Sequence, residues 1–380
     1  MTARLGRLVV EGLRSVRRIE LDLTTDVTVL IGANGSGKSN LVGALELVSR
    51  IWDGSFQEYL RRRGGMAGSL FSGAEGTAPR AVIEVSAPFP DGPDRTGTYR
   101  VTLEATDEDD CIIREVLSVR VADSQDEEFS LGSRPARRSW VRQASADPGE
   151  PSYEFVNYFT PLLEGCRVFH FDDVSERAPV KGWSTVGDDV SLRSDAENIA
   201  AYLLRLRDEC PGCYRRIVSA VRHVTPFFDD FVLVPSAAGR VRLRWRQRGM
   251  DRTLMAREAS DGTLRFICLA TLLLGPDLPA TVVLDEPELG LHPAAIALLA
   301  EMTHIAGRNG HRVIVATQSV PLLSHYGLDE VVVLDRVDGA TQASRPSAES
   351  LEGFLEDHSI GTLWEMNLLG GRPVREDVCV

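Results

Sequence analysis

A glycine-rich segment near the start of the chain carries the residues best suited to phosphate chemistry. Residues 32–39, GANGSGKS, fit the spacing G-x-x-x-x-G-K-[ST]. In this spacing the glycines let backbone N–H groups turn toward phosphate oxygens, Lys38 reaches the β- and γ-phosphates, and Ser39 can ligate Mg²⁺. The sequence therefore predicts that ATP and Mg²⁺ bind at Asn34, Gly35, Ser36, Gly37, Lys38, Ser39 and Asn40.

Two adjacent carboxylates follow an apolar run late in the chain, in TVVLDEPELGLHP, residues 281–293. Such a run predicts a buried strand, and ligands of open parallel sheets lie at the carboxyl ends of the strands. We expect Asp285 to hold the magnesium ion and Glu286 to act as the base that activates the attacking water, a role worth roughly 10²–10⁴ in rate. Ordinary solvated acids at a strand end are the weaker alternative, because they would have to coincide with the phosphate loop by accident.

A third polar strand end occurs in VIVATQSVPLL, residues 313–323. A polar side chain at the end of this strand can approach the γ-phosphate from the side, and we assign that role to Gln318. The predicted catalytic residues are thus Lys38, Glu286 and Gln318.

The segment EASDGTLRF, residues 258–266, is typical of a turn that opens a helix, because the apolar run ICLATLLL follows it. Ser260 and the N–H groups of Gly262 and Thr263 would face an anion at the helix N-terminus. The alternative is a simple helix cap formed by the serine.

Strands and helices must bring these segments together. The runs 5–23 and 27–32 read as strands, a helix follows the phosphate loop, and the last third alternates strand and helix. This order predicts an α/β fold with a mostly parallel sheet. Runs of period-two alternation at 80–87, 98–105 and 111–122 predict an antiparallel β meander.

Four regions follow from these patterns. Residues 1–122 would form the first part of the ATPase domain, with the phosphate loop and the meander, and residues 251–380 would complete that domain. Residues 123–150, poor in aliphatic side chains and rich in charge, Ser and Pro, predict a mobile loop. Residues 151–250, with two amphipathic helices, predict an inserted lobe of helices and strands.

The motifs IGANGSGKSN, SDGTLR, LDEPELGLHP and ATQS, in this order, resemble those of ABC-type P-loop ATPases of the SMC, RecF and OLD group. The stand-alone predicted AAA-family ATPases of that group are most similar, since they share SDGT, PE-x-GLHP and a closing LLGG-x-P. The resemblance covers roughly residues 5–60 and 255–373, and the middle is recognised only by position.

The resemblance implies a homodimer around two nucleotides, in which the SDGT turn of one subunit binds the γ-phosphate held by the other. Two residues depart from the family pattern: Asp261 stands where a second glycine is usual, and Gln318 stands where transporter-type members carry His. The second departure implies slow hydrolysis. The glutamine that would link Mg²⁺ to the moving lobe cannot be assigned, and Gln57 is the only candidate between Ser39 and the meander.

The inserted region is too short for the long coiled coils of SMC proteins, so a compact RecF-like lobe is expected. Too few residues follow ATQS for the TOPRIM nuclease domain of OLD-type proteins. Within the lobe, GRVRLRWRQRG, residues 239–249, would place one row of guanidinium groups on a strand face: Arg240, Arg242, Arg244, Arg246 and Arg248. The row could follow a DNA backbone, or it could protect an edge strand; the second interpretation is slightly favoured.

Composition limits the other possibilities. The 42 Lys and Arg residues against 55 Asp and Glu give a net charge of −13, which argues against coating of nucleic acid or membrane by bulk charge. No apolar run approaches the ~20 residues that span a bilayer, and no signal peptide is visible, so a cytoplasmic protein without a membrane partner is predicted. The pair CPGC at 210–213 reads as a turn carrying thiols rather than as half of a zinc site.

The sequence thus favours a slowly hydrolysing, dimerising ATPase that acts on DNA or gates a partner effector, in DNA repair or phage defence by resemblance. The alternative is a nucleotide-sensing regulatory module that holds a nuclease or toxin inactive. A transporter subunit is disfavoured, because LDEPELGLHP and SDGT resemble the soluble group.

Overall fold

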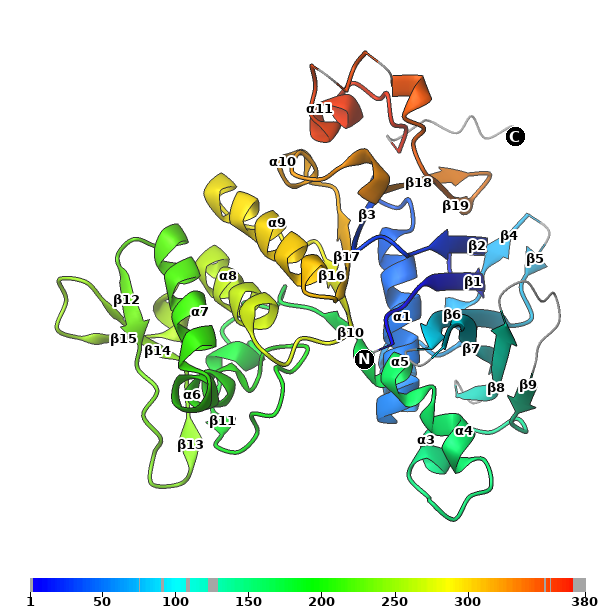
Figure 1. The fold of residues 1–380 in the computed structure, drawn as a ribbon, viewed down its shortest axis with the longest axis horizontal. Coiled ribbons are helices and arrows are strands. Elements are labelled where there is room, and N and C mark those ends of the chain that lie inside the picture. Colours follow the sequence, from blue (N-terminus) through cyan, green and yellow to red (C-terminus); the bar gives the residue numbers. More distant parts are fainter. Residues whose placement is uncertain are drawn as a thin grey trace.

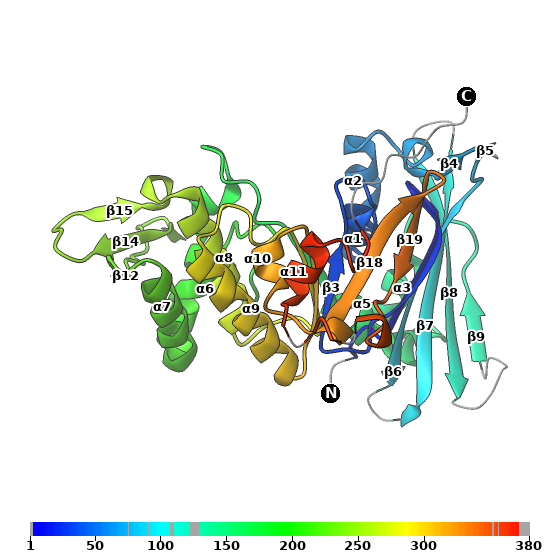
Figure 2. The ribbon, with the colours of Figure 1, turned by 90° about the horizontal axis from the view of Figure 1, so that it is seen from above.

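The computed structural model describes residues 3–74, 76–89, 92–106, 110–121, 129–351, 353–355 and 357–371. A mostly parallel sheet lies in the middle of the molecule, an antiparallel sheet lies on one side of it, and a lobe of helices and short strands lies on the other (Figure 1). In the view from above, the lobe and the antiparallel sheet form opposite ends of the molecule (Figure 2).

The central sheet has the strand order β10-β16-β17-β3-β18-β19. All neighbours pair in parallel except β18 and β19, so the predicted mostly parallel sheet is confirmed. Its strands are β10 (Cys166–Phe169), β16 (Thr281–Asp285), β17 (Arg312–Thr317), β3 (Val27–Ile31), β18 (Val331–Val337) and β19 (Ala340–Ser344).

Helices cover both faces of this sheet, which explains why its strands are continuous apolar runs. Val27, Val29 and Ile31 of β3 belong to the core shared with α8 (Asp261–Leu274) and α9 (Pro293–Arg308). Leu30 of β3 points to the other face and joins the core of α1 (Lys38–Asp53). The central strand is therefore buried on both faces.

The second sheet is antiparallel, with the order β2-β1-β6-β7-β8-β9, and it confirms the predicted meander. Alternate residues of β8, such as Cys111, Ile113 and Leu117, enter the core, as period-two patterning requires. The strands of this sheet are β1 (Arg7–Leu13), β2 (Val16–Asp22), β6 (Ala81–Phe89), β7 (Gly92–Ala105), β8 (Cys111–Val121) and β9 (Phe129–Gly132). Two further strands, β4 (Ser72–Gly73) and β5 (Gly76–Thr77), pair with each other in a separate sheet.

The prediction of a loop over residues 123–150 is wrong for two segments. Residues 129–132 form β9, and residues 140–145 form helix α3 (Trp140–Ser145). The buried carboxylate of Glu115 on β8 organises this segment. It accepts hydrogen bonds from the Ser139 hydroxyl at 2.7 Å and from the Trp140 N–H at 2.6 Å. Residues 123–128 of the expected loop lie outside the described residues.

The lobe begins later than residue 151. Helices α4 (Tyr153–Asn157) and α5 (Thr160–Gly165) precede β10, which is the edge strand of the central sheet. The lobe proper consists of β11 (Ser184–Thr185), α6 (Ile199–Glu209), α7 (Pro211–Val224), β12 (Phe228–Phe231), β13 (Arg240–Val241), β14 (Arg244–Gln247) and β15 (Thr253–Met255). The lobe extends beyond the predicted boundary at residue 250, because β15 pairs with β14 of the lobe.

The remaining helices are α2 (Phe56–Arg62), α10 (Val320–Leu323) and α11 (Ile360–Glu365). No helix in the described part of the chain is long and apolar enough to cross a membrane. Cys210 and Cys213 form a disulfide at the start of α7, where free thiols were expected. Among the described residues, no group of three or more His, Cys, Asp or Glu side chains is placed to hold a metal ion.

Candidate nucleotide-binding site

The phosphate loop connects β3 to α1, as the motif requires. Gly37 has φ of 110°, which favours glycine, and a Cβ atom there would lie 2.2 Å from the Thr341 hydroxyl oxygen on β19. The buried Lys38 ammonium donates to the carbonyls of Gly32 at 2.7 Å and Ala33 at 3.1 Å. Burial lowers the pKa of Lys38, while the nearby Glu286 and Asp285 oppose that change.

The other predicted loop residues lie around this turn. Asn34, Gly35 and Ser39 are exposed, whereas Ser36 is buried and its hydroxyl has no hydrogen-bond partner among the described residues. Asn40 points toward the β1–β2 turn, where its amide donates to the Ser15 hydroxyl at 2.6 Å.

The carboxylate of Asp285 at the end of β16 lies beside Ser39. Burial raises the pKa of Asp285, and a hydrogen bond with the Ser39 hydroxyl opposes the rise. One Asp285 oxygen, Oδ1, is buried and has no hydrogen-bond partner among the described residues. A buried carboxylate oxygen without a donor, next to a hydroxyl, fits Mg²⁺, which prefers oxygen ligands. These two residues were the predicted magnesium ligands.

Glu286 and Gln318 meet at the ends of neighbouring strands. The Gln318 amide donates to the Glu286 carboxylate at 2.9 Å. Glu286 has φ of 45°, in the left-handed region that non-glycine residues rarely adopt. Strained backbone of this kind is common at functional sites.

A second buried carboxylate, Glu288, lies in the same loop and was not assigned from the sequence. The Thr317 hydroxyl donates to Glu288 and accepts from the Ser319 N–H at 2.9 Å. Burial raises the pKa of Glu288 to about 7. The loop after β16 and the end of β17 are therefore joined twice, through Glu288–Thr317 and through Glu286–Gln318.

His170 follows β10 at the same edge of the sheet and was also missed. It lies 3.3 Å from the carboxylate of Glu46 on α1. Burial would raise the pKa of Glu46, but hydrogen bonds from His170 and Tyr59 lower it to about 2. The hydrogen bond with Glu46 in turn raises the pKa of His170, which is also near Asp285. The polar residues after the short, mostly apolar run CRVF were the available sequence signal.

The SDGT turn forms the start of α8. Ser260 is the N-cap, and its hydroxyl accepts from the Thr263 N–H at 3.2 Å. Asp261 is exposed. A Cβ atom at Gly262 would lie 2.2 Å from the carbonyl oxygen of Gly290, so the turn packs against the loop after β16. The helix cap predicted as the alternative is thus present, while the N-terminus of α8 stays open to solvent at Ser260.

Arg265, four residues beyond Asp261 in the same helix, connects three segments. Its buried guanidinium donates to the Phe171 carbonyl at 2.8 Å, to the Asp172 carbonyl at 3.0 Å, and to the Leu289 carbonyl. Helix α8 is thereby tied to the segment after β10 and to the loop after β16.

The suggestion that Gln57 contacts the magnesium site is wrong. Its amide donates to the carbonyls of Cys111 and Arg137, both at 2.8 Å, near the end of α1 opposite to the phosphate loop. The segment after β10, which includes His170, adjoins the magnesium site instead.

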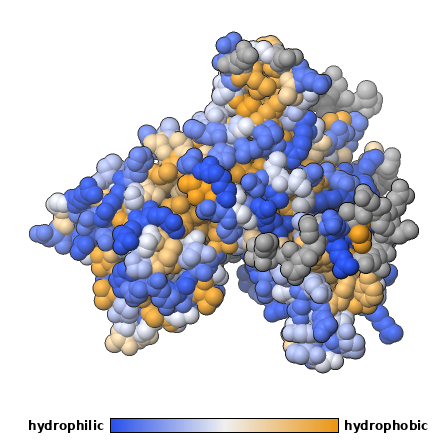
Figure 3. Space-filling view, in the orientation of Figure 1, coloured by the Kyte–Doolittle hydropathy of each residue, from blue (hydrophilic) through white to orange (hydrophobic). Residues whose placement is uncertain are grey.

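The arginine row does not form one strand, since β13 ends at Val241 and β14 begins at Arg244. The alternation nevertheless holds, because Val241, Leu243 and Trp245 are buried while the arginines are exposed or half-buried. Arg242 lies over the Trp183 ring at 4.3 Å, and Arg246 pairs with Asp229 at 3.3 Å. The outer end of this lobe is mostly hydrophilic (Figure 3).

The fold is that of SMC head domains. The SMC head bound to the C-terminal winged-helix domain of ScpA matches with a TM-score of 0.61 and 14% identity, over 91% of this chain and 98% of that chain. An SMC head with an extended coiled coil from Pyrococcus furiosus, bound to the C-terminal domain of ScpA, matches with a TM-score of 0.59 and 15% identity, over 93% and 99%.

No curated protein sequence matches the chain significantly. The family model described as "AAA domain, putative AbiEii toxin, Type IV TA system" matches residues 27–324. This range runs from β3 through β16 and β17 into α10, so it contains the phosphate loop and both carboxyl strand ends. The chain therefore belongs to this family of AAA-type ATPase domains, with the P-loop fold of the SMC and RecF group of ABC-type ATPases.

Proposed function

We propose that the protein binds ATP with Mg²⁺, hydrolyses it slowly, and forms an ATP-sandwiched homodimer that acts on DNA or gates a partner effector in the cytoplasm. One observation carries this proposal: Lys38, Ser39, Asp285, Glu286 and Gln318 converge at the carboxyl edge of β3, β16 and β17. Ligands of open α/β sheets bind at this edge.

Each residue has a distinct part in the proposed reaction. The backbone N–H groups of residues 34–40 and the Lys38 ammonium bind the phosphates. Ser39 and Asp285 would hold Mg²⁺, which when bound neutralises phosphate charge. Glu286 accepts the proton of the attacking water, and Gln318 orients the Glu286 carboxylate through the hydrogen bond of 2.9 Å. Since Gln318 is an amide and not an imidazole, hydrolysis is slow.

The dimer would form through the N-terminus of α8. In the proposed complex Ser260, Gly262 and Thr263 of one subunit face the γ-phosphate held by the other, because N–H groups at a helix start attract anions. Exposure of Ser260 and Asp261 leaves this end accessible. Arg265 would pass movement of α8 to the loop after β16, through the Leu289 carbonyl.

The target of the proposed activity is DNA or an effector. One observation supports DNA: the row of Arg240, Arg242, Arg244, Arg246 and Arg248, whose side chains are exposed or half-buried. The family description, a putative toxin of a type IV toxin–antitoxin system, favours the second candidate: a nucleotide-sensing module that controls a nuclease or toxin in phage defence.

Two substitutions test the hydrolytic site. Glu286→Gln keeps the side-chain size and should retain ATP binding while it lowers turnover by roughly 10²–10⁴, because the base is lost. Lys38→Ala should lose affinity itself, because a phosphate contact is lost. ATP binding by calorimetry and phosphate release measure the two effects. Undiminished turnover in Glu286→Gln contradicts the assignment of the base.

The dimer is tested by Ser260→Arg in the Glu286→Gln background. ATP should convert Glu286→Gln protein to a dimer, and Ser260→Arg should abolish the dimer while binding of ATP to the monomer stays nearly unchanged. Light scattering with and without ATP measures the mass. If Glu286→Gln protein stays monomeric with ATP, or if Ser260→Arg alone hydrolyses ATP normally, the turn is a helix cap only.

The arginine row is tested by Arg242→Glu, Arg244→Glu and Arg246→Glu together. If the row binds DNA phosphates, the triple variant should lose DNA retention and the salt dependence of binding, because each contact releases counterions. Should the wild-type protein with ATP not bind DNA at low salt, the effector-controlling module becomes the better proposal.

A further inference from the structure

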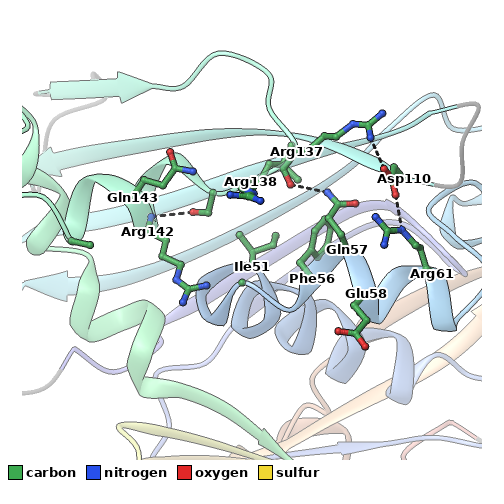
Figure 4. Close-up of a pocket in the computed structure, with 14 residues that line it drawn as sticks. Ile51, Phe56, Gln57, Glu58, Arg61, Asp110, Arg137, Arg138, Arg142 and Gln143 are labelled. Carbon is green, nitrogen blue, oxygen red and sulfur yellow. Dashed lines mark hydrogen bonds and ion pairs between the residues drawn. The ribbon is translucent and has the colours of Figure 1, made fainter.

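A second cavity lies at the far end of α1 from the phosphate loop. It has a volume of about 680 Å³ and is bounded by the end of α1, by α2, by β8 and by α3 (Figure 4). Pockets for small molecules usually have volumes of roughly 300–1,000 Å³. Helix α1 runs over Lys38–Asp53, so about 24 Å separates this cavity from the phosphate loop. The cavity is therefore distinct from the nucleotide site.

The lining of this cavity is strongly basic, although the chain as a whole has a net charge of −13. Its charged residues are Arg61, Arg137, Arg138, Arg142, Glu58 and Asp110.

Both acids in the lining already have arginine partners. Asp110 lies between Arg61 at 2.9 Å and Arg137 at 2.7 Å, and Glu58 pairs with Arg62 on the same helix. Arg138 and Arg142 remain exposed, and in the described part of the chain no acidic side chain forms a salt bridge with either. Two positive charges thus remain for a ligand.

The backbone that carries these arginines is held in place before any ligand binds. The Gln57 amide donates to the carbonyls of Arg137 and Cys111, and its oxygen accepts from the Cys111 N–H at 3.1 Å. The buried Ser139 caps α3 and donates to Glu115 at 2.7 Å. Fixed backbone on both sides of Arg138 reduces the entropy lost when its guanidinium binds a ligand.

The position of Arg142 is also restricted. A Cβ atom at Gly54 would lie 1.7 Å from an Arg142 guanidinium nitrogen, so the side chain extends along the C-terminal end of α1. Figure 4 shows Arg138 above Ile51 and Arg142 beside the end of the helix. The rest of the lining is partly apolar, from Ile51, Phe56, Ile113 and Ala146, and partly polar, from Gln57, Ser139 and Gln143.

We propose that this cavity binds a small phosphorylated molecule with an aromatic or apolar body. Arg138 and Arg142 pair with the phosphate oxygens, because the planar guanidinium matches phosphate in a bidentate way. Ile51, Phe56 and Ile113 contact the body of the ligand. The volume of about 680 Å³, half open to solvent, and the apolar part of the lining favour a small molecule over a nucleic-acid backbone, which needs an extended basic surface and no apolar cavity.

The test uses phenyl phosphate as the probe, because it combines one phosphate with an aromatic ring and lacks the linked phosphates that a phosphate loop holds. Binding to the full chain is measured by calorimetry. The wild-type protein and Lys38→Ala should bind equally, while Arg138→Glu with Arg142→Glu should weaken binding at least about tenfold, as expected for lost charge-assisted bonds. ATP affinity of the double variant should stay within about twofold of wild type, since α1 separates the sites.

Arg134→Glu is the matched control, because Arg134 is exposed in the same segment but does not line the cavity. It should leave phenyl phosphate binding unchanged. If the change at Arg142 unfolds the protein, Arg138→Glu alone replaces the double variant in the binding measurement. The proposal is overturned if the wild-type protein does not bind the probe, if Lys38→Ala abolishes binding, or if Arg134→Glu weakens binding as much as the cavity variants. It is also overturned if single-stranded DNA but not phenyl phosphate binds through Arg138 and Arg142.

Discussion

The backbone strain at Glu286 gives a prediction that separates stability from activity. With φ of 45°, Glu286 has a conformation that costs a residue with a Cβ atom roughly 1–2 kcal/mol. Glu286→Gly should remove this cost, whereas Glu286→Ala keeps it. Both variants lose the hydrogen bond from Gln318, and both keep the Glu286 N–H bond to the Ala316 carbonyl at 2.8 Å. The comparison of Gly with Ala therefore isolates the strain.

At an ordinary backbone position Ala is more stable than Gly by roughly 0.5–1 kcal/mol, because Gly loses more conformational freedom on folding. Subtracting this entropy from the strain leaves the Gly variant more stable than the Ala variant by about 0–1.5 kcal/mol. Urea unfolding of both variants, analysed with equal m-values, measures the difference. Phosphate release should be low in both, since both lack the carboxylate. An Ala variant that is more stable than the Gly variant by the roughly 0.5–1 kcal/mol of an ordinary position would refute the interpretation that strain is stored at this residue.

Three further predictions concern other parts of the molecule. Gly262→Ala would place a Cβ atom 2.2 Å from the Gly290 carbonyl oxygen and should destabilise the fold by about 1–3 kcal/mol in urea unfolding; unchanged stability would mean that α8 does not pack so closely on the loop. Glu115→Ala removes the acceptor shared by Tyr99, Ser139, Trp140 and Val141 and should cost about 2–4 kcal/mol, with faster amide exchange at Trp140 and Val141, while Glu115→Gln should cost less. Because the hydrogen bond with Glu330 raises the pKa of His304, that pair stabilises the fold fully below the unfolded pKa of about 6.5 and less as pH rises through the folded pKa. His304→Gln should therefore lower the free energy of unfolding by about 1 kcal/mol near pH 6 and by less near pH 9, and a gap that grows with pH would contradict this sign.

Local patterns in the sequence predicted the parts of the fold that depend on local chemistry. Continuous apolar runs predicted β3, β16, β17 and β18 of the central sheet, because burial on both faces requires such runs, and period-two alternation predicted the meander. The phosphate loop and the carboxyl ends of β16 and β17 followed from motif spacing. Their convergence could be predicted because the carboxyl ends of parallel strands lie at one edge.

Contacts between distant segments were not predictable in this way. The run CRVF falls within the predicted lobe, because nothing local distinguishes a short edge strand of the central sheet, and the sequence therefore does not assign His170 to the site. The charged segment after β8 has the composition of a loop, and the sequence does not show its order because that order depends on Glu115, which lies outside the segment. The arginine row was expected as one strand, yet its two halves pair with different partners, Arg240 with Thr185 of β11 and Arg246 with Asp230 of β12.

The position of β3 in the central sheet bears on how the chain folds during synthesis. β3 spans Val27–Ile31, but its two neighbours, β17 and β18, begin only at Arg312 and Val331. The phosphate loop also donates a hydrogen bond to a residue far along the chain, since the Ala33 N–H donates to the Gly371 carbonyl at 2.7 Å. On the ribosome, the antiparallel sheet can form while β3 still lacks both neighbours. The apolar β3 therefore cannot pair with its neighbours in the central sheet until β17 and β18 have been synthesised, and the complete phosphate loop forms only after Gly371 has been added.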